Sequence, residues 1–293
     1  MDSGGKDRKG EKGVKGVKGE KGEKDDKDDK KSESGSESSE SEEEADPYAS
    51  LKRPADTVGD VRKLELLYFK PECVPDSFSA ILYGQRRTGK TTWLTWFLYC
   101  MQGKVDHVVC FSSTNFTGHY GQYMNPDLCY DSFNEDVLQK VLDIQAATPA
   151  SQRKRVLVIL DDVLDQEKEL RQSTSLKALF TMGRHYGISV VVTTQYAKCI
   201  PVGWRRNVDF ACVFYTFSRD MCDIYHKEYG MLLNKNQFFS IMQSACVGFR
   251  ALLIRPCTRS SNIRDVYQLT EAMPHRAFHI GRRKKEASDT ENF

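Results

Sequence analysis

The hydrophobic positions of this 293-residue chain form short apolar runs that alternate with segments of helical spacing. Runs of consecutive β-branched and other apolar residues are typical of strands buried on both faces of a parallel sheet. Such runs predict strands over residues 64–69, 78–83, 105–112, 155–162, 188–194, 210–217 and 247–254. Helical spacing predicts helices over residues 91–101, 134–145, 173–184, 219–229 and 236–243. This alternation indicates one α/β domain in which helices flank a mostly parallel sheet.

Two segments inside this pattern lack a regular period. Residues 114–133 are polar and rich in Gly, Asn and Tyr, which predicts a long loop. Residues 197–207, AKCIPVGWRRN, predict a shorter loop that carries a tryptophan and two adjacent arginines. Long loops inside a compact domain are often functional, so both segments are candidates for contacts with a partner.

Composition divides the chain into four parts. Residues 1–46 contain five Gly-X-Lys triplets and then an acidic segment rich in Ser and Glu, with few apolar side chains. Five triplets without a proline are too few for a stable collagen helix, and the composition predicts a disordered, charged tail. We expect a linker over 47–61, one globular α/β domain over 62–280, and a basic, flexible tail over 281–293.

The formal net charge of +2 conceals an uneven distribution. Residues 1–46 hold 11 Lys and Arg against 16 Asp and Glu, so the rest of the chain holds 32 against 25, a net charge of +7. This surplus suits a polyanionic partner. The nine cysteines include no Cys-X-X-Cys pair or zinc-ligand cluster, and no apolar run is long enough to span a bilayer. With no signal peptide, we expect free thiols and a location inside the cell, without secretion.

The stretch 84–91, GQRRTGKT, matches the phosphate-loop pattern G-x4-GK-[ST] and lies between a predicted strand and a predicted helix. Gly84 and Gly89 permit the tight turn that directs backbone N–H groups at one phosphate chain. Lys90 can reach the outer phosphates of ATP, and the Thr91 hydroxyl can bind a bridging Mg²⁺. The residues expected to contact the nucleotide are Gly84, Gln85, Arg86, Arg87, Thr88, Gly89, Lys90, Thr91 and Thr92. A chance glycine turn before a helix is the alternative.

Polar side chains also follow two of the predicted buried strands. Asp161 and Asp162 end the run 155–162, and Gln195 follows the run 188–194. Ligands of open α/β sheets bind at the carboxyl ends of the strands, which places all three residues beside the phosphate loop. Asp161 is then the predicted Mg²⁺ ligand, Asp162 the group that orients or deprotonates an attacking water, and Gln195 a contact to the γ-phosphate or the water. A solvated Asp-Asp turn and an ordinary strand-end glutamine are the alternatives.

Three segments together resemble the FtsK–HerA superfamily of DNA-pumping ATPases: GQRRTGKTT, VLVILDDV, and GRHYGISVVVTTQY followed by IPVGWRRNVDF. Within it, residues 62–255 look like the genome-packaging ATPases of large double-stranded DNA viruses of the poxvirus type. The resemblance implies a RecA-like P-loop NTPase fold with ATP and Mg²⁺ as cofactors. It implies that Lys90, Asp162 and Gln195 are catalytic, and that Thr91 and Asp161 bind the metal. Many members of the superfamily look as though they use Glu at position 162, which leaves the activation of water open.

By the same resemblance, an arginine from a neighbouring subunit is expected to meet the charge that develops on the transferred phosphoryl group. Arg184, Arg205 and Arg206 are the candidates, and each can equally be an ordinary surface arginine. The segment 114–133 and the loop with Arg205 and Arg206 are also candidates for gripping DNA through its backbone.

The implied function is ATP hydrolysis to ADP and phosphate by a homo-oligomeric ring, a pentamer or hexamer, that pumps viral double-stranded DNA into a preformed capsid. The expected partners are double-stranded DNA and components of the capsid or portal vertex. The expected location is the host nucleus, a cytoplasmic virus factory or the virion. Alternatives are a non-catalytic nucleotide switch in virion assembly, a small-molecule kinase with the same loop, and a host or plasmid translocase.

Overall fold

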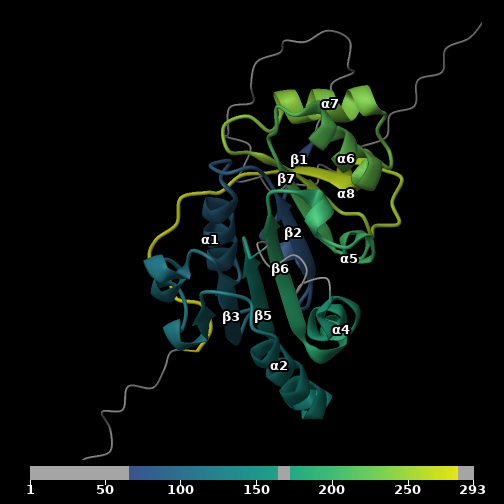
Figure 1. Cartoon of the computed structure of the whole chain (residues 1–293). Coiled ribbons are helices and arrows are strands. Elements are labelled where there is room, and N and C mark those ends of the chain that lie inside the picture. The colour runs from purple at the N-terminus through teal and green to yellow at the C-terminus, as the bar shows by residue number, and fades with distance from the viewer. Residues whose placement is uncertain (1–65, 164–171, 283–293) are drawn as a thin grey trace, which may run out of the picture. The chain divides into compact units, whose positions relative to one another are not determined.

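The computed structural model describes residues 66–163 and 172–282 (Figure 1). The chain divides into two units, Met1–Pro47 and Tyr48–Phe293, and every described residue belongs to the second. The predicted tail 1–46, the linker 47–61, the domain start 62–65 and the tail end 283–293 lie outside the described residues. The first two residues of the predicted basic tail are described, and the Arg282 N–H donates to the Asp106 carbonyl at 3.0 Å.

A nine-stranded sheet with the order β1-β9-β8-β7-β2-β6-β5-β3-β4 organises the described part of the chain (Figure 1). Its strands are β1 (Leu67–Tyr68), β2 (Ser79–Tyr83), β3 (His107–Ser112), β4 (Cys129–Tyr130), β5 (Val156–Asp161), β6 (Ile188–Thr194), β7 (Phe210–Phe214), β8 (Ala251–Ile254) and β9 (Tyr267–Thr270). Neighbouring strands are parallel except that β8 runs antiparallel to both β7 and β9. The predicted α/β fold with a mostly parallel sheet is thereby confirmed. The apolar pattern missed β9, because its sequence, YQLT, is short and only partly apolar.

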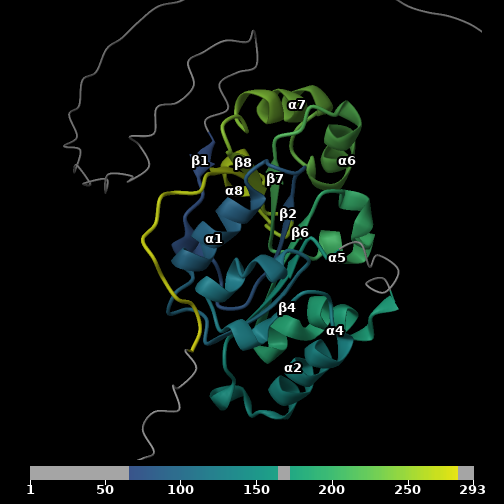
Figure 2. The ribbon, with the colours of Figure 1, turned by 60° about the vertical axis from the view of Figure 1, so that its left-hand side comes forward.

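Helices cover both faces of this sheet (Figures 1 and 2). On one face, α1 (Lys90–Cys100) shares a hydrophobic core with Ala80 and Leu82 of β2. A second core, which contains Ile81 and Tyr83, lies on the other face. Its helices are α2 (Glu135–Ala147), α4 (Thr174–Met182), α5 (Val202–Arg206), α6 (Arg219–Tyr229), α7 (Lys235–Ser244) and α8 (Ile263–Val266). Because successive side chains of a strand point to opposite faces, β2 contributes to both cores.

Local sequence signals begin most of these helices. Asn134, Ser173 and Ser218 each accept a hydrogen bond from the backbone N–H three residues ahead, and they begin α2, α4 and α6. Asn234 and Gln237 form a capping box at the start of α7. Each predicted helix corresponds to one of these elements, although the third ends as a 3-10 turn, η7 (Gly183–Tyr186). None of the helices that the structure describes is long and apolar enough to cross a membrane.

An aromatic cluster fixes α1 on the sheet. Trp93 and Phe97 stack with ring centroids 5.0 Å apart, and Phe97 meets Phe78 at 5.6 Å and Phe210 at 5.9 Å. Trp93 Nε1 also donates to Thr270 Oγ1 of β9 at 2.7 Å. These contacts hold the helix that follows the phosphate loop against the centre of the sheet.

The predicted loop 114–133 contains only short turns and a two-residue strand, whereas the predicted loop 197–207 is mostly helical, so the second of these two predictions was wrong. The segment 114–133 contains three 3-10 turns and β4, and it buries Tyr120 and Met124. The turns are η2 (Asn115–Thr117), η3 (Tyr120–Gln122) and η4 (Pro126–Leu128). The segment 197–207 forms η8 (Ala197–Cys199) and α5, whose Trp204 stacks on Phe180 at 4.8 Å. In both segments irregularly spaced apolar residues anchor the chain, and a search for a regular period misses them.

Two strands are shorter than their apolar runs predict. β7 ends at Phe214 rather than Phe217, and β8 begins at Ala251 rather than Val247. Antiparallel pairing of these strands stops at Phe214 and Ala251. The aromatic side chains beyond it, Phe217 and Phe249, are exposed. Their hydrophobicity therefore does not serve the core.

Candidate nucleotide-binding site

The phosphate loop joins the carboxyl end of β2 to α1, and β2 lies between β6 and β7 in the middle of the sheet. The Gly84 N–H donates to the Thr194 carbonyl at the end of β6 at 3.1 Å. A β-carbon on Gly84 would lie 2.5 Å from Thr88 Oγ1 and 2.9 Å from Phe214 Cβ, so a side chain does not fit. Gly89 has a φ of +97°, a conformation that favours glycine. Local geometry therefore requires both glycines of the motif.

Lys90 begins α1 with its side chain inside the phosphate loop. Its Nζ donates to the carbonyls of Gly84 at 2.6 Å and Gln85 at 3.0 Å, and the residue is 9% exposed. Burial lowers the pKa of Lys90, while the negative charges of Asp162 and Asp161 oppose that shift. A lysine that lies inside the loop and near two carboxylates is suited to contact the outer phosphates of a nucleotide.

The remaining loop residues lie closer to solvent. Gln85, Arg86 and Arg87 are exposed, and Thr88 is half-buried. Arg87 has a left-handed φ of +64°. Thr91 and Thr92 are exposed in the first turn of α1, where backbone N–H groups lack partners within the helix. Because the positive end of the helix dipole also lies there, this turn attracts anionic ligands.

Asp161 ends β5 and is held by hydroxyl groups from three other segments. Its Oδ1 accepts from Thr193 Oγ1 of β6 at 2.6 Å, and its Oδ2 accepts from Tyr120 OH at 2.8 Å and Ser112 Oγ of β3 at 3.1 Å. The residue is 4% exposed. A carboxylate accepts about four hydrogen bonds, so three donors orient it and still leave room for one further partner.

Asp162 and Gln195 come together beyond the ends of β5 and β6. Gln195 Nε2 donates to both oxygens of the Asp162 carboxylate, at 3.0 and 3.2 Å. The Asp162 N–H donates to Thr193 Oγ1 at 3.1 Å, and its carbonyl accepts from Ser113 Oγ at 3.0 Å. Asp162 has a left-handed φ of +51°, which departs from the extended backbone of the strand. The structure thus brings the predicted catalytic carboxylate into contact with Gln195, the predicted contact to the γ-phosphate or the water.

The oxygen donors of this site fit a magnesium ion that is shared with a nucleotide. Mg²⁺ usually binds through one or two carboxylates together with phosphate oxygens and water. Asp161 and the exposed Thr91 hydroxyl are donors of this kind. Within residues 66–163 and 172–282, no group of three or more His, Cys, Asp or Glu side chains could hold a metal alone. A magnesium ion here would therefore depend on the phosphates for further ligands.

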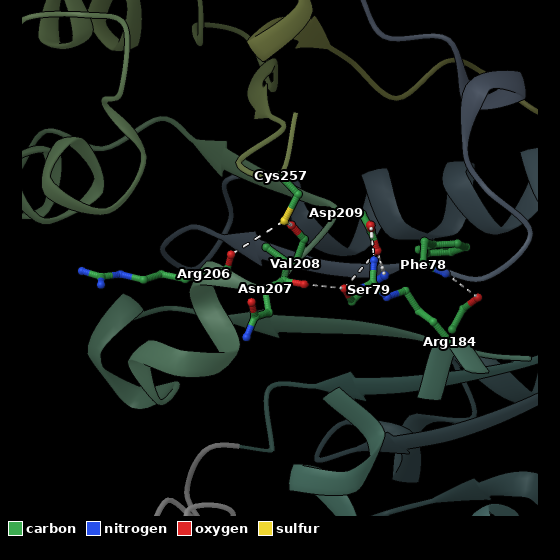
Figure 3. Close-up of polar contacts among 9 residues, drawn as sticks. Phe78, Ser79, Arg184, Arg206, Asn207, Val208, Asp209 and Cys257 are labelled. Atoms are coloured by element: carbon green, nitrogen blue, oxygen red, sulfur yellow. Dashed lines mark hydrogen bonds and ion pairs between the residues drawn. The ribbon is translucent and has the colours of Figure 1, made fainter. Parts of the chain in front are cut away.

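Arg184 lies at the opposite, amino edge of the sheet (Figure 3). Its Nη1 pairs with Asp209 Oδ1 at 3.0 Å, and its side chain is 53% exposed. Asp209 Oδ2 accepts from the backbone N–H of Ser79 at 2.7 Å and from its hydroxyl at 3.1 Å. Because Ser79 begins β2 and the phosphate loop follows the end of β2, the length of this strand separates Arg184 from the phosphate loop of the same chain.

Arg205 and Arg206 end α5 and differ sharply in exposure. Arg205 Nη2 pairs with Glu228 Oε1 at 3.3 Å, and both side chains are buried, at 6% and 9% exposure. The Arg205 carbonyl also accepts from Tyr229 OH at 3.3 Å. Such enclosure argues against Arg205 as a trans arginine or a DNA contact. Arg206 lies 3.7 Å from the same carboxylate with its side chain 65% exposed.

Three partners of Asp161 were not singled out from the sequence: Ser112, Thr193 and Tyr120. Ser112 and Thr193 pair with Asp161 in the registers of β3 and β6. Parallel alignment of the predicted strands could have indicated both. No period or motif marks Tyr120, which comes from the irregular segment 114–133.

A phosphate loop between a central strand and a buried helix, with carboxylates at the ends of adjacent parallel strands, defines a P-loop NTPase fold. Residues 67–262 match the family described as poxvirus A32 protein. Because the match covers more than half of the chain, the chain belongs to the poxvirus A32 protein family. The resemblance to the poxvirus-type branch is thereby confirmed.

Relatives occur in other large DNA viruses. An uncharacterized protein of frog virus 3 (isolate Goorha) is 23% identical over 189 residues, which are 63% of this chain and 58% of that protein. An uncharacterized protein of invertebrate iridescent virus 3 is 26% identical over 187 residues, 63% of this chain and 71% of that protein. The similarity to the frog virus protein thus spans less than two thirds of its length.

Solved structures share this fold at low sequence identity. The genome packaging NTPase B204 from Sulfolobus turreted icosahedral virus 2, in complex with AMPPCP, has a TM-score of 0.52 and 12% identity, covering 68% of this chain and 100% of that chain. B204, the DNA-packaging ATPase from Sulfolobus turreted icosahedral virus, has a TM-score of 0.52 and 14% identity, covering 68% and 99%. These likenesses support the P-loop NTPase fold.

Proposed function

We propose that this chain is an ATP-hydrolysing motor that packages viral double-stranded DNA into a preformed capsid. The observation that carries the proposal is the contact between the Gln195 amide and the Asp162 carboxylate, beside Asp161. A nucleotide switch needs a phosphate loop, whereas hydrolysis also needs groups that position and deprotonate water. Membership in the poxvirus A32 family and the likeness to genome packaging NTPases support packaging as the purpose of that hydrolysis.

The phosphate loop, in this proposal, binds ATP through its backbone N–H groups and the first turn of α1. Lys90 exchanges its contacts with the Gly84 and Gln85 carbonyls for oxygens of the outer phosphates. Thr91 and Asp161 would hold Mg²⁺, which would supply positive charge to offset that of the phosphates. The hydroxyl groups around Asp161 keep its carboxylate oriented for that role.

Asp162 and Gln195 act on the attacking water. Asp162 accepts its proton, and the Gln195 amide, which donates to both carboxylate oxygens, fixes the direction of the carboxylate. The amide oxygen of Gln195 then accepts a hydrogen bond from the same water. Because aspartate reaches less far than glutamate, this amide extends the polar surface toward the γ-phosphate.

We also propose a homo-oligomeric ring, a pentamer or hexamer, that encircles double-stranded DNA and docks on capsid or portal-vertex components inside the infected cell. The net charge of +7 outside the tail suits a grip on the phosphate backbone. The exposed Arg206 is the favoured contact to DNA or to ATP in a neighbouring subunit. Arg184 is the second candidate in trans, because the amino edge of one subunit can face the phosphate loop of the next.

Steady-state hydrolysis of Mg·ATP by the full chain, with and without linear duplex DNA, tests this function. We expect DNA to raise the rate and Lys90→Ala to abolish hydrolysis in both conditions. Lys235→Ala is the matched control, because Lys235 lies on α7 and pairs with Asp223 in a solvent-exposed ion pair. Nucleotide binding without turnover would indicate an assembly switch instead. DNA-independent transfer of the γ-phosphate to a small acceptor would indicate a kinase.

A further inference from the structure

The order of strands gives the direction in which a nucleotide lies across the phosphate loop. β6 and then β5 lie on one side of β2, and β7 and then β8 lie on the other. Asp161 ends β5, and Asp162 and Gln195 directly follow β5 and β6, so the terminal phosphate points to that side. The nucleoside end must then extend toward β7 and β8. This step rests on the proposed function.

Two exposed aromatic rings lie where β7 and β8 separate. Phe217 comes three residues after the last residue of β7 and is 80% exposed, and Phe249 comes two residues before β8 and is 66% exposed. Phe249 reaches the phosphate loop: a β-carbon on Gly89 would lie 3.1 Å from Cδ1 and 3.4 Å from Cβ of Phe249. An exposed aromatic ring therefore occupies the space that a side chain at position 89, directly before Lys90, would enter.

The backbone around Phe249 is unusual for its sequence. Phe249 has a φ of +70°, next to Gly248 with a φ of +72°. A phenylalanine seldom adopts this left-handed conformation, whereas a glycine does so readily. Arg250 Nε donates to the Val247 carbonyl at 2.9 Å, and Ala251 pairs with Phe214, so the turn is held at both ends. Strained backbone conformations of this kind concentrate at ligand-binding sites. The Phe249 ring is too exposed for core packing to account for its conformation.

We propose that Phe249 is the platform on which the base of the bound nucleotide stacks. Its ring lies at the nucleoside side of the phosphate loop, and the absence of a side chain on Gly89 lets the ring approach the loop. Stacking on an aromatic face uses the π system of the base and tolerates different bases. A large base offers more surface for stacking, so the Phe249 ring favours purines. Because phenylalanine has no hydrogen-bonding group, the ring does not discriminate between adenine and guanine.

Equilibrium binding of Mg·ATP and of inorganic tripolyphosphate to the full chain tests this role. Phe249→Ala is expected to weaken ATP binding about tenfold, which is the usual loss of affinity when one base–aromatic stacking contact is removed. Binding of tripolyphosphate, which has no base, is expected to stay unchanged and also reports that the phosphate loop is intact. Phe249→Tyr is expected to retain wild-type affinity. Phe116→Ala is the matched control, because Phe116 is 79% exposed on η2.

Two outcomes overturn the inference. Unchanged ATP affinity in Phe249→Ala would show that the ring does not touch the base. Equal losses for ATP and tripolyphosphate would show that Phe249 shapes the phosphate loop instead. If the wild-type chain binds neither ligand, the proposed function itself fails. If the wild type hydrolyses ATP and Phe249→Ala matches it in both affinities, the function stands and the stacking role alone is rejected.

Discussion

The carboxyl and amino edges of the sheet are built on different principles. The three non-glycine residues with left-handed φ in the described part of the chain, Arg87, Asp162 and Phe249, all lie at the carboxyl edge. At the amino edge, the polar groups pair with one another in ordinary strand and turn geometry. There Asp209 accepts hydrogen bonds from Ser79 and Arg184 (Figure 3).

We interpret this contrast as the difference between a proposed ligand site and a support for the fold. A non-glycine residue with left-handed φ costs on the order of 1–3 kcal/mol and persists where surrounding structure fixes it. Paired polar groups at a buried strand end instead stabilise the fold. Substitutions at the carboxyl edge should therefore change activity at nearly constant stability, and substitutions at the amino edge should do the reverse.

Asp162→Asn should give the largest effect at the carboxyl edge. Loss of the proton acceptor is expected to lower single-turnover ATP hydrolysis by about 10²–10⁴-fold, while ATP affinity persists. The free energy of unfolding should change by less than about 0.5 kcal/mol, because the amide keeps the size and shape of the carboxylate. Asp223→Asn, on the exposed part of α6, is the control. Hydrolysis at the wild-type rate would mean that another group accepts the proton.

Arg205→Ala should give the largest loss of stability near the amino edge. It removes the buried partner of Glu228 and leaves this buried carboxylate only the exposed Arg206, at 3.7 Å, so we expect a loss of about 3 kcal/mol in the free energy of unfolding, measured by urea denaturation. Arg206→Ala removes an exposed side chain and should cost less than about 0.5 kcal/mol. Stimulation of hydrolysis by DNA should fall in Arg206→Ala. Equal stability of the two variants would contradict the structural role of Arg205. Stimulation of hydrolysis by DNA at the wild-type level in Arg206→Ala would exclude Arg206 as a DNA contact.

Asp209→Ala tests the amino edge with a smaller effect. The change leaves the buried Ser79 N–H, now 2.7 Å from Asp209 Oδ2, without an acceptor and releases Arg184. We expect a loss of about 2 kcal/mol in the free energy of unfolding, with hydrolysis at saturating ATP unchanged. Asp223→Ala controls for the loss of a surface charge. A drop in hydrolysis at full stability would place Asp209 in the catalytic machinery and break the contrast.

Local motifs and the rule for parallel sheets predicted which side chains gather at the carboxyl edge of the sheet, beside the phosphate loop. The glycine pattern located Lys90, and the carboxyl ends of buried strands located Asp161, Asp162 and Gln195. The different environments of the two α5 arginines could not be predicted. Arg205 and Arg206 are adjacent and identical in type, and their difference depends on where α6 places Glu228.

Residues that reach the site from irregular segments were also beyond sequence reasoning. The apolar pattern assigns Phe249 to the predicted strand 247–254, because Val247 and Phe249 precede the apolar residues of β8. Tyr120 lay in a segment without a period, although its ring is buried and its hydroxyl contacts Asp161. Such contacts depend on how distant segments pack against one another, and a local sequence pattern does not predict that packing.

Tyr120→Phe should produce the smallest effect, because Asp161 keeps two of its three hydroxyl donors. Burial raises the pKa of Tyr120 well above its usual value, and the Asp161 charge adds to this shift. The phenol therefore stays protonated at neutral pH and can donate to Asp161. Losing this bond of 2.8 Å should cost about 1 kcal/mol of stability and raise the half-saturating Mg²⁺ concentration for hydrolysis about fivefold.

The matched control for this substitution is Tyr123→Phe. Tyr123 belongs to the same segment, and it stacks its ring on Phe278 with centroids 4.9 Å apart, a contact that does not involve the hydroxyl. If both variants retain wild-type dependence on Mg²⁺, Ser112 and Thr193 orient Asp161 without help. A shift in Tyr120→Phe alone would show that the segment 114–133 reaches the metal side of the site through one hydroxyl. In that case, a partner that moves this segment could change the rate of hydrolysis.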